Sequence, residues 1–290
     1  MALRNLIAAS ILLLSIVMAH SALAGSVTQP GDTMGTASGV ANPEGFYFVN
    51  QANGGCAGPT PRLCVWTEVP LLAWTTPWKI LGASLAIVTG PTTLVHASLR
   101  NKFHKTALFN PFVGTTWTWA LGHGLGFTYL LGGYFDIDTN IAYSSSSLNQ
   151  RFAFGYYDNG WNLTENTILG INFDQSNTDP QGAACPTAPQ LACNNNFLNV
   201  DLTATKRFGK WELGLIGFLA ADISTPIPGY SRQKKAAIGG LAGYYFGPAI
   251  VQIYGTTEVY ERHYYGKDTR LWSRITVPLG HPPAPPRPFW

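Results

Sequence analysis

Hydrophobic and polar residues alternate along much of this chain in short segments, the pattern of β-strands with two unlike faces. In residues 197–208, Asn199 and Asp201 fall on one face while Leu198 and Val200 fall on the other. Twelve such segments follow one another, bounded by Gly, Pro, Asn and Asp. The predicted strands are 44–52, 63–75, 77–91, 108–120, 123–136, 148–158, 161–174, 196–208, 210–224, 233–246, 248–261 and 268–279.

The connections between these segments alternate between long and short. The long ones are 53–62, 92–107, 137–147, 175–195, 225–232 and 262–267, and the short ones lie near Thr76, Gly122, Asn159, Gly209 and Gly247. An outer-membrane barrel has short periplasmic turns and longer external loops, and an even strand number brings both barrel ends to the periplasmic side. This strict alternation of long and short connections is not expected of a soluble β-sandwich.

Aromatic residues flank each short turn, in the motifs WTTPW, WTWALGHG, YYDNGW, RFGKWE and YYFGPA. Trp and Tyr gather at membrane interfaces because their bodies are apolar while their N–H or O–H tips prefer water. Ordinary core aromatics are the alternative, but a place beside every short turn argues against it. The sequence therefore predicts an all-β fold: a transmembrane antiparallel up-and-down β-barrel of about 12 strands, over residues 44–280.

The composition agrees with a barrel. Charged residues make up 11% of the chain, against roughly 25% in a soluble domain. Mean hydropathy is only +0.06, as expected if one face of each strand meets lipid and the other a lumen. The net charge of +3 gives no reason to expect a nucleic-acid partner. The expected partners are the lipid bilayer and a small-molecule solute, with the oligomeric state left open.

Residues 1–24 have the features of a secretory signal peptide: Arg4, an apolar run over 6–18, and small residues at 22–24. The run is shorter than the ~20 residues of a transmembrane helix, the alternative reading. We therefore expect export to the bacterial outer membrane. Residues 25–43 are small, polar and Gly-rich, which predicts a periplasmic lead-in, and no extended plug domain is expected. Residues 281–290 form a Pro-rich tail that cannot be a central strand.

The four cysteines form two local pairs, Cys56 with Cys64 and Cys185 with Cys193. An exported protein meets an oxidising compartment, which favours disulfides. Three connectivities are possible, and the two local bonds are favoured because each closes a single loop. Neither pair has CxxC spacing or a nearby His, so we expect no metal site, and no motif calls for a cofactor.

No catalytic constellation stands out. The histidines beyond the signal never form an HxxxH motif or any other metal-ligand spacing. Ser84 or Ser273 could pair with a His, as a hydrolase requires, but no spacing selects a pair. A barrel-embedded hydrolase remains the weaker alternative, and we predict that the protein is not an enzyme.

The alternation also predicts which side chains line the lumen. The candidates are Arg151, Asn166, Asn172, Asp201, Thr203, Glu212, Phe218, Asp222, Lys235, Gln252, Tyr254, Glu258, Arg270 and Arg274. Such charges either brace the interior by pairing or line a narrow path, and both readings stay open. Inward apolar positions such as Ile168 and Ile216 favour an aromatic or hydrophobic solute over a general porin, and twelve strands imply a small bore.

Several segments resemble a known family: GVANPEGFYFVNQ, PLLAWTTPWKILGASLAIVTGP, the Gly-rich aromatic centre and NLTENTILGINFD. Together, over residues 41–280, they resemble the outer-membrane family described as "putative MetA-pathway of phenol degradation". The resemblance implies an exported barrel linked with aromatic-compound degradation and hydrophobic-compound transport. The predicted function is an outer-membrane channel or transporter that passes small, aromatic or hydrophobic compounds by facilitated diffusion. The alternative is a structural or surface-interaction barrel with a sealed lumen.

Overall fold

The computed structural model describes residues 26–59, 62–99, 103–137, 145–173, 195–225, 230–264 and 266–279. The predicted signal peptide, the pair Cys185 and Cys193, and the Pro-rich tail lie outside the described residues. Among the described residues, no helix is long and apolar enough to cross a membrane.

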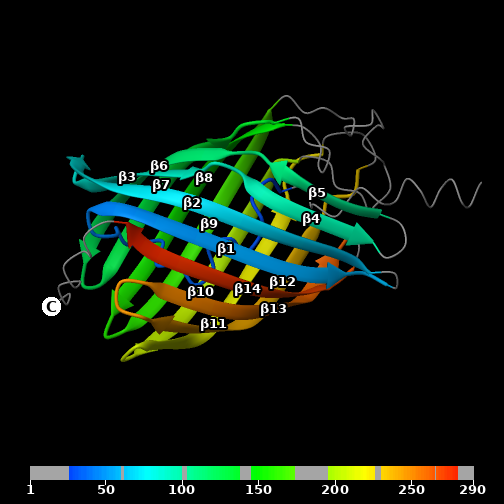
Figure 1. Ribbon diagram of the computed structural model, residues 1–290. Helices are drawn as coiled ribbons and strands as arrows, with labels where there is room; N and C mark the ends of the chain where they lie inside the picture. Colours follow the sequence, from blue (N-terminus) through cyan, green and yellow to red (C-terminus); the bar gives the residue numbers. More distant parts are fainter. Residues whose placement is uncertain are drawn as a thin grey trace, which may run out of the picture.

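The described part of the chain is built from strands (Figure 1). Their bounds are β1 (Gly45–Ala57), β2 (Leu63–Ile80), β3 (Ala83–Gly90), β4 (Thr93–Leu99), β5 (Phe103–Phe109), β6 (Phe112–Gly122), β7 (Leu125–Tyr134), β8 (Ser146–Asp158), β9 (Trp161–Phe173), β10 (Phe197–Phe208), β11 (Trp211–Asp222), β12 (Lys234–Tyr245), β13 (Ile250–Arg262) and β14 (Asp268–Leu279).

Twelve of these strands close into an antiparallel barrel. All strands except β4 and β5 belong to it, and each pairs with its neighbour along the chain. The first strand closes the ring because it pairs with β14 on one side and with β2 on the other. Asn50, for example, lies between Ile275 and Pro70. The predicted twelve-stranded up-and-down barrel is therefore confirmed.

The predicted loop 92–107 is wrong, because most of it forms the hairpin β4–β5. β3 and β4 pair in turn with the two halves of β2, and β5 then pairs with β4. Pro91 and Pro111 separate β3 from β4 and β5 from β6, since proline has no N–H to give to the ladder. The hairpin thus extends the sheet past the barrel at the end that carries the long connections, here called the long-loop end (Figure 1).

The opposite end, here called the short-turn end, carries tight turns. Leu81–Gly82, His123–Gly124 and Asn159–Gly160 each have positive φ at both positions, from 49° to 79°. This is the geometry of type I′ turns, whose twist matches that of the paired strands. Glycine relieves the strain at the second position of each turn.

The predicted turn near Thr76 is wrong. β2 continues to Ile80, and its register against β3 shifts between Thr75 and Lys79. Pro77 lies within this shift. A proline has no N–H for the ladder, and a bulge is a place in a strand where one is tolerated. The bulge keeps Trp74 and Trp78 in contact, with ring centroids 5.3 Å apart.

The outer surface of the barrel is apolar between aromatic residues. On β11 the outward residues Leu213, Leu215 and Leu219 are all exposed, and Leu215 is 70% exposed. Near the short-turn end, aromatic rings contact one another across neighbouring strands, as Trp119 does with Phe127. An outward apolar band beside an aromatic girdle is the surface of a barrel that spans a membrane.

We expect Leu215→Arg to destabilise the barrel folded in lipid by about 2–4 kcal/mol, which is the cost of a cation near the bilayer midplane. Leu81→Arg, at the β2–β3 turn, is the matched control and should cost about 0–1 kcal/mol because it lies at the interface or beyond. Equilibrium refolding into vesicles across a urea series measures both variants. Equal losses at the two sites would contradict the position of the apolar band.

One predicted disulfide is confirmed. Cys56 on β1 and Cys64 on β2 are register partners, and their sulfur atoms are 2.05 Å apart. The bond ties the first two barrel strands together at the long-loop end.

Candidate functional site

The interior of the barrel is polar and densely bonded. The structure places all fourteen predicted lumen residues on the inner face, where Arg151, Lys235 and Arg270 are half-buried and the others are buried. Whether any of them contacts a solute stays a prediction.

Two ion pairs brace the wall near the long-loop end. Lys235 Nζ lies 3.0 Å from Glu258 Oε1, and Arg270 Nη2 lies 2.6 Å from Asp268 Oδ2. Arg270 also donates to Asn53 Oδ1. These charged side chains pair with other wall residues. Of the two roles that the sequence left open, bracing the interior or lining a path, the pairs show the first.

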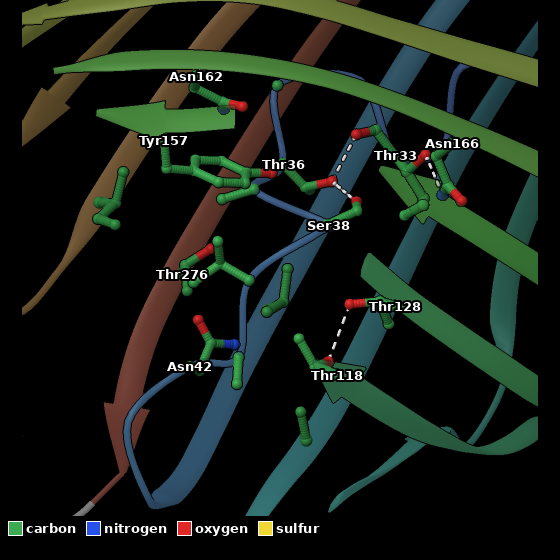
Figure 2. Close-up of a pocket in the computed structure, with 18 of the residues that line it drawn as sticks. Thr33, Thr36, Ser38, Asn42, Thr118, Thr128, Tyr157, Asn162, Asn166 and Thr276 are labelled. Carbon is green, nitrogen blue, oxygen red and sulfur yellow. Dashed lines mark hydrogen bonds between the residues drawn. The ribbon is translucent and has the colours of Figure 1, made fainter. Parts of the chain in front are cut away.

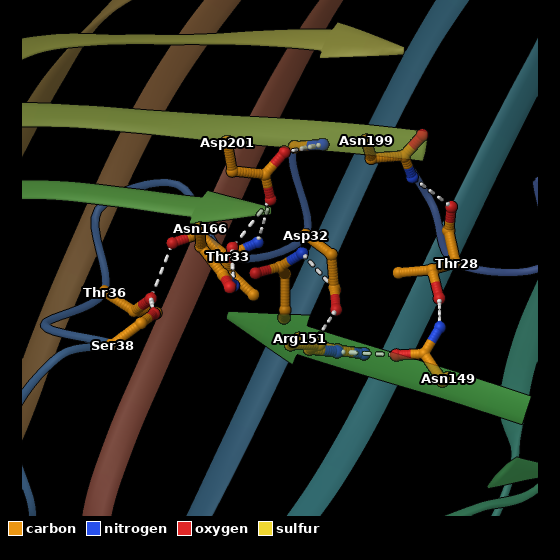
Figure 3. A network of polar contacts seen from close by, with 12 residues as sticks. Thr28, Asp32, Thr33, Thr36, Ser38, Asn149, Arg151, Asn166, Asn199 and Asp201 are labelled. Atoms are coloured by element: carbon orange, nitrogen blue, oxygen red, sulfur yellow. Dashed lines mark hydrogen bonds and ion pairs between the residues drawn. The ribbon is translucent and has the colours of Figure 1, made fainter. Parts of the chain in front are cut away.

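The N-terminal segment lies inside the barrel. The sequence predicts a periplasmic lead-in over residues 25–43, yet residues 26–42 run through the lumen and join β1 at the short-turn end (Figures 1 and 3). Thr28 and Met34 are 1% and 0% exposed. This stretch, residues 26–42, is here called the plug segment.

Asp201 on β10 holds the middle of the plug segment. Its carboxylate accepts hydrogen bonds from the backbone N–H groups of Gly31 (2.9 Å) and Thr33 (2.8 Å), and from the Thr33 hydroxyl (2.7 Å). Asn166 on β9 donates to the same hydroxyl at 2.8 Å (Figure 3). Charge-assisted bonds of this kind are the stronger ones in a dry interior.

Arg274 on β14 holds the plug segment from the other side. Its guanidinium donates to the carbonyl oxygens of Met34 (2.6 Å) and Asp32 (2.8 Å) and also to Gln51. The Asp32 carboxylate faces Arg151 of β8, with Oδ2 and Nη1 3.5 Å apart. The segment is therefore held by a buried anion on β10 and a buried cation on β14, four strands apart in the barrel.

The end of the plug segment nearest the long loops is held by neutral groups. Asn149 donates to the Thr28 hydroxyl at 2.9 Å, and Asn199 donates to the Thr28 carbonyl at 3.1 Å. Gln29 exchanges hydrogen bonds with Asn53 at 3.0 and 3.2 Å. Amide side chains suit this position because each one both donates and accepts.

Apolar packing completes the contact between plug and wall. Met34 lies in a buried cluster with wall residues from β11 to β14, including Phe218, Leu241, Tyr254 and Trp272. The Tyr254 and Trp272 rings stack with centroids 5.6 Å apart. Part of the inward apolar surface that the sequence suggested for a solute is thus covered by the plug segment itself.

A cavity of about 690 Å³ remains in the half of the barrel nearest the short turns. Its wall combines small apolar side chains such as Ala86, Val88 and Ala153 with hydroxyls such as Thr118 and Thr128. Figure 2 shows the Thr118–Thr128 hydrogen bond (2.9 Å) on this wall. The plug segment, from residue 33 to residue 42, supplies one side of the lining, and charged or amide wall residues such as Arg207, Glu212 and Gln252 also contribute.

Sequence reasoning missed most of these cavity residues, because the lumen prediction selected charged and large polar side chains. The alternation of β2 and β3 also assigns small residues, such as Ala73 and Ala86, to the inner face, and this signal could have identified them. Among the described residues, no three His, Cys, Asp or Glu side chains gather in a way that could hold a metal ion.

A closed barrel with an apolar outer band, aromatic residues at its turns and a polar lumen defines the class of outer-membrane β-barrels. The chain belongs to the family described as "Putative MetA-pathway of phenol degradation", whose sequence profile matches residues 47–275. A search of curated proteins returned no match.

The barrel is similar to several solved structures, and the first of them supports the fold. The COG4313 outer membrane channel from Pseudomonas putida F1 aligns with a TM-score of 0.59 and 11% identity, covering 87% of this chain and 100% of that one. The β domain of the Bordetella autotransporter BrkA aligns at 0.49 and 11% identity, over 82% and 100%. The CymD monoaromatic hydrocarbon channel aligns at 0.44 and 11%, over 83% and 90%. At this identity the likeness concerns the fold.

Proposed function

We propose that this protein is an outer-membrane channel that passes small, aromatic or hydrophobic compounds by facilitated diffusion. The observation that carries the proposal is the cavity of about 690 Å³ inside the barrel. Its volume lies within the range of small-molecule sites. Membership of a family named for phenol degradation supports an aromatic solute, and the N-terminal signal predicted from the sequence supports the outer membrane.

One side of the cavity, formed mainly by β3, β6 and β7, favours a solute with an apolar body. Methyl groups of Ala86, Val88 and Ala153 offer dispersion contacts, while the hydroxyls of Thr118 and Thr128 can bond a single polar group. A sugar of similar mass would need many more partners to replace its hydration. Charged and amide side chains such as Arg207, Glu212 and Gln252 also line the cavity, so a direct comparison of an aromatic solute with a sugar is needed to test this preference.

The plug segment supports a second candidate, a structural barrel whose lumen stays sealed. Its bonds to Asp201 and Arg274 cross the lumen between the cavity and the long-loop end. In that case the surface loops would carry the function.

Uptake into liposomes distinguishes the two candidates. Initial rates are compared for a phenol-sized aromatic and a sugar of similar mass, at matched protein density, with protein-free liposomes correcting for leakage through lipid. Faster entry of the aromatic alone supports the selective channel, and entry of both indicates a general pore. Acceleration of neither by a folded barrel, judged by heat-dependent gel mobility, leaves the sealed barrel.

Filling the cavity should block the channel. Ala153, on β8, is 2% exposed and lines the cavity, so Ala153→Trp places an indole where the solute would lie. We expect the initial uptake rate to fall about tenfold, because the bulk of the ring occupies a volume of ligand size. Leu163→Trp, on the outer face of β9, is the control and should leave uptake unchanged. Equal rates for the two variants would place the path elsewhere.

A further inference from the structure

The plug segment touches the wall through a contact between glycines. Gly39 lies on Gly126 of β7 and Gly155 of β8, which are register partners. A Cβ on Gly126 would lie 2.2 Å from the Gly39 carbonyl oxygen, and a Cβ on Gly39 would lie 2.6 Å from the Gly155 nitrogen. These three residues, here called the glycine seat, allow two backbones to approach more closely than any side chain would permit.

Close approach, and not backbone conformation, explains the three glycines. None of them is among the residues of positive φ, so each has a conformation that alanine can also adopt. Tyr157 completes the seat, because its hydroxyl accepts a hydrogen bond from Gly39 N–H at 3.2 Å. A side chain at Gly126 would therefore act on the plug segment and leave the strand geometry intact.

Beyond the seat, the plug segment is weakly held in its last stretch. Among the hydrogen bonds of the described residues, the one from Gly39 to Tyr157 is the single bond that joins residues 36–42 to the wall. Thr36 and Ser38 bond each other, and Val40 N–H bonds the Ala37 carbonyl. Segments with few contacts to the rest of a structure are those that open locally.

We propose that the plug segment is a displaceable gate that rests on the glycine seat, and that a solute passes only when the segment moves off the wall. This inference rests on the proposed function. It also gives the segment a part in selectivity, because residues 33–42 line the cavity and retreat from it when the gate opens. Between the cavity and the long-loop end, the Asp201 and Arg274 bonds set how readily the segment leaves.

Gly126→Ala tests the seat. The added methyl group cannot coexist with Gly39 in its present place, so the docked state loses stability and the open population rises. We expect ion conductance in planar bilayers and aromatic uptake to rise about tenfold. Gly240→Ala on the outer face of β12 is the matched control, because the nearest atom to its Cβ is 3.9 Å away. Tyr157→Phe, which removes the hydroxyl that bonds Gly39 and Thr164 but adds no bulk to the seat, should give a smaller rise.

A covalent lock tests the need for movement. In Thr28→Cys/Asn149→Cys the new thiols replace side chains that are 2.9 Å apart, and oxidation or a short bis-maleimide ties the plug segment to β8. We expect uptake to fall to the protein-free rate and to recover on reduction of the disulfide. Wild-type protein given the same reductant controls for the native bond between Cys56 and Cys64.

The results of these experiments distinguish a failure of the gate proposal from a failure of the proposed transport function. Unchanged uptake by the locked protein, or equal conductance of Gly126→Ala and Gly240→Ala, overturns the gate. If the wild-type protein passes no aromatic solute but Gly126→Ala conducts ions and Gly240→Ala does not, the proposed function fails and the gate stands.

Discussion

Deletion of residues 26–40 is expected to convert the barrel into an open pore, with ion conductance about tenfold or more above that of the full chain. The plug segment crosses the lumen from Thr28 to Gly39 and bonds to β8, β10 and β14 of the wall. Without it, a twelve-stranded barrel retains a narrow lumen into which water and ions can enter. Selectivity for the aromatic over the sugar should fall at the same time, because one side of the cavity disappears.

The shortened chain is expected to fold. The deletion lies before β1, so the register of every barrel pair is kept. Asp201 and Arg274 would lose their bonds to the plug segment, but water entering the lumen would hydrate both charges. The loss is therefore smaller than for a charge left dry and unpaired.

Single-channel recording in planar bilayers measures the effect, and heat-dependent gel mobility reports folding. A synthetic peptide of residues 26–42 added to the shortened protein should restore the low conductance. Asp201→Ala, which removes the central anchor in the complete chain, should give an intermediate conductance, with the lipid-facing Leu202→Ala as its neighbour control. A shortened barrel that is folded and yet closed would contradict the position of the plug segment.

Trp272→Ala is expected to destabilise the barrel by about 3–5 kcal/mol, the usual cost of truncating a buried aromatic residue. Trp272 is 1% exposed, stacks on Tyr254 and donates from Nε1 to the Thr256 hydroxyl at 2.9 Å. Its ring also lies close to Gly31 of the plug segment. The variant should therefore lose stability and loosen the plug together.

Urea-dependent refolding into vesicles measures this loss of stability. Leu271→Ala, one residue away on the outer face and 61% exposed, is the control and should cost less. Trp272→Phe should fall between the two, since it keeps an aromatic ring but loses the N–H donor. If Leu271→Ala costs as much as Trp272→Ala, the inner cluster is not a main source of stability.

The strands could be predicted because their signal is local. Each barrel strand needs one apolar and one polar face, so a period of two appears within a dozen residues, as between Phe197 and Phe208. The same parity assigns Asp201, Gln252 and Arg274 to the interior once the outer face is known to be apolar. The β2–β3 turn escaped this reasoning, because the bulge at Pro77 carries the strand beyond the residue where turn signals first appear.

The plug segment could not be predicted from periodicity. Residues 26–42 have neither a strand pattern nor a helix pattern, and Gly31 and Gly35 are as common in linkers as in tight turns. The bonds that fix the segment join residues far apart in the sequence, such as Gly31 with Asp201 and Met34 with Arg274. Nothing near either partner reveals the other.

The amino-acid sequence by itself determined the membrane barrel: its strand number, its inner and outer faces, its aromatic turns and the pairing of Cys56 with Cys64. These features follow from alternation and spacing, which neighbouring residues express directly. Only the tertiary structure decided that the N-terminal segment lies in the lumen, that Gly39 rests on Gly126 and Gly155, and that a cavity remains beside them. Those features depend on which surfaces meet after the barrel closes, and closure brings together residues that the sequence keeps apart.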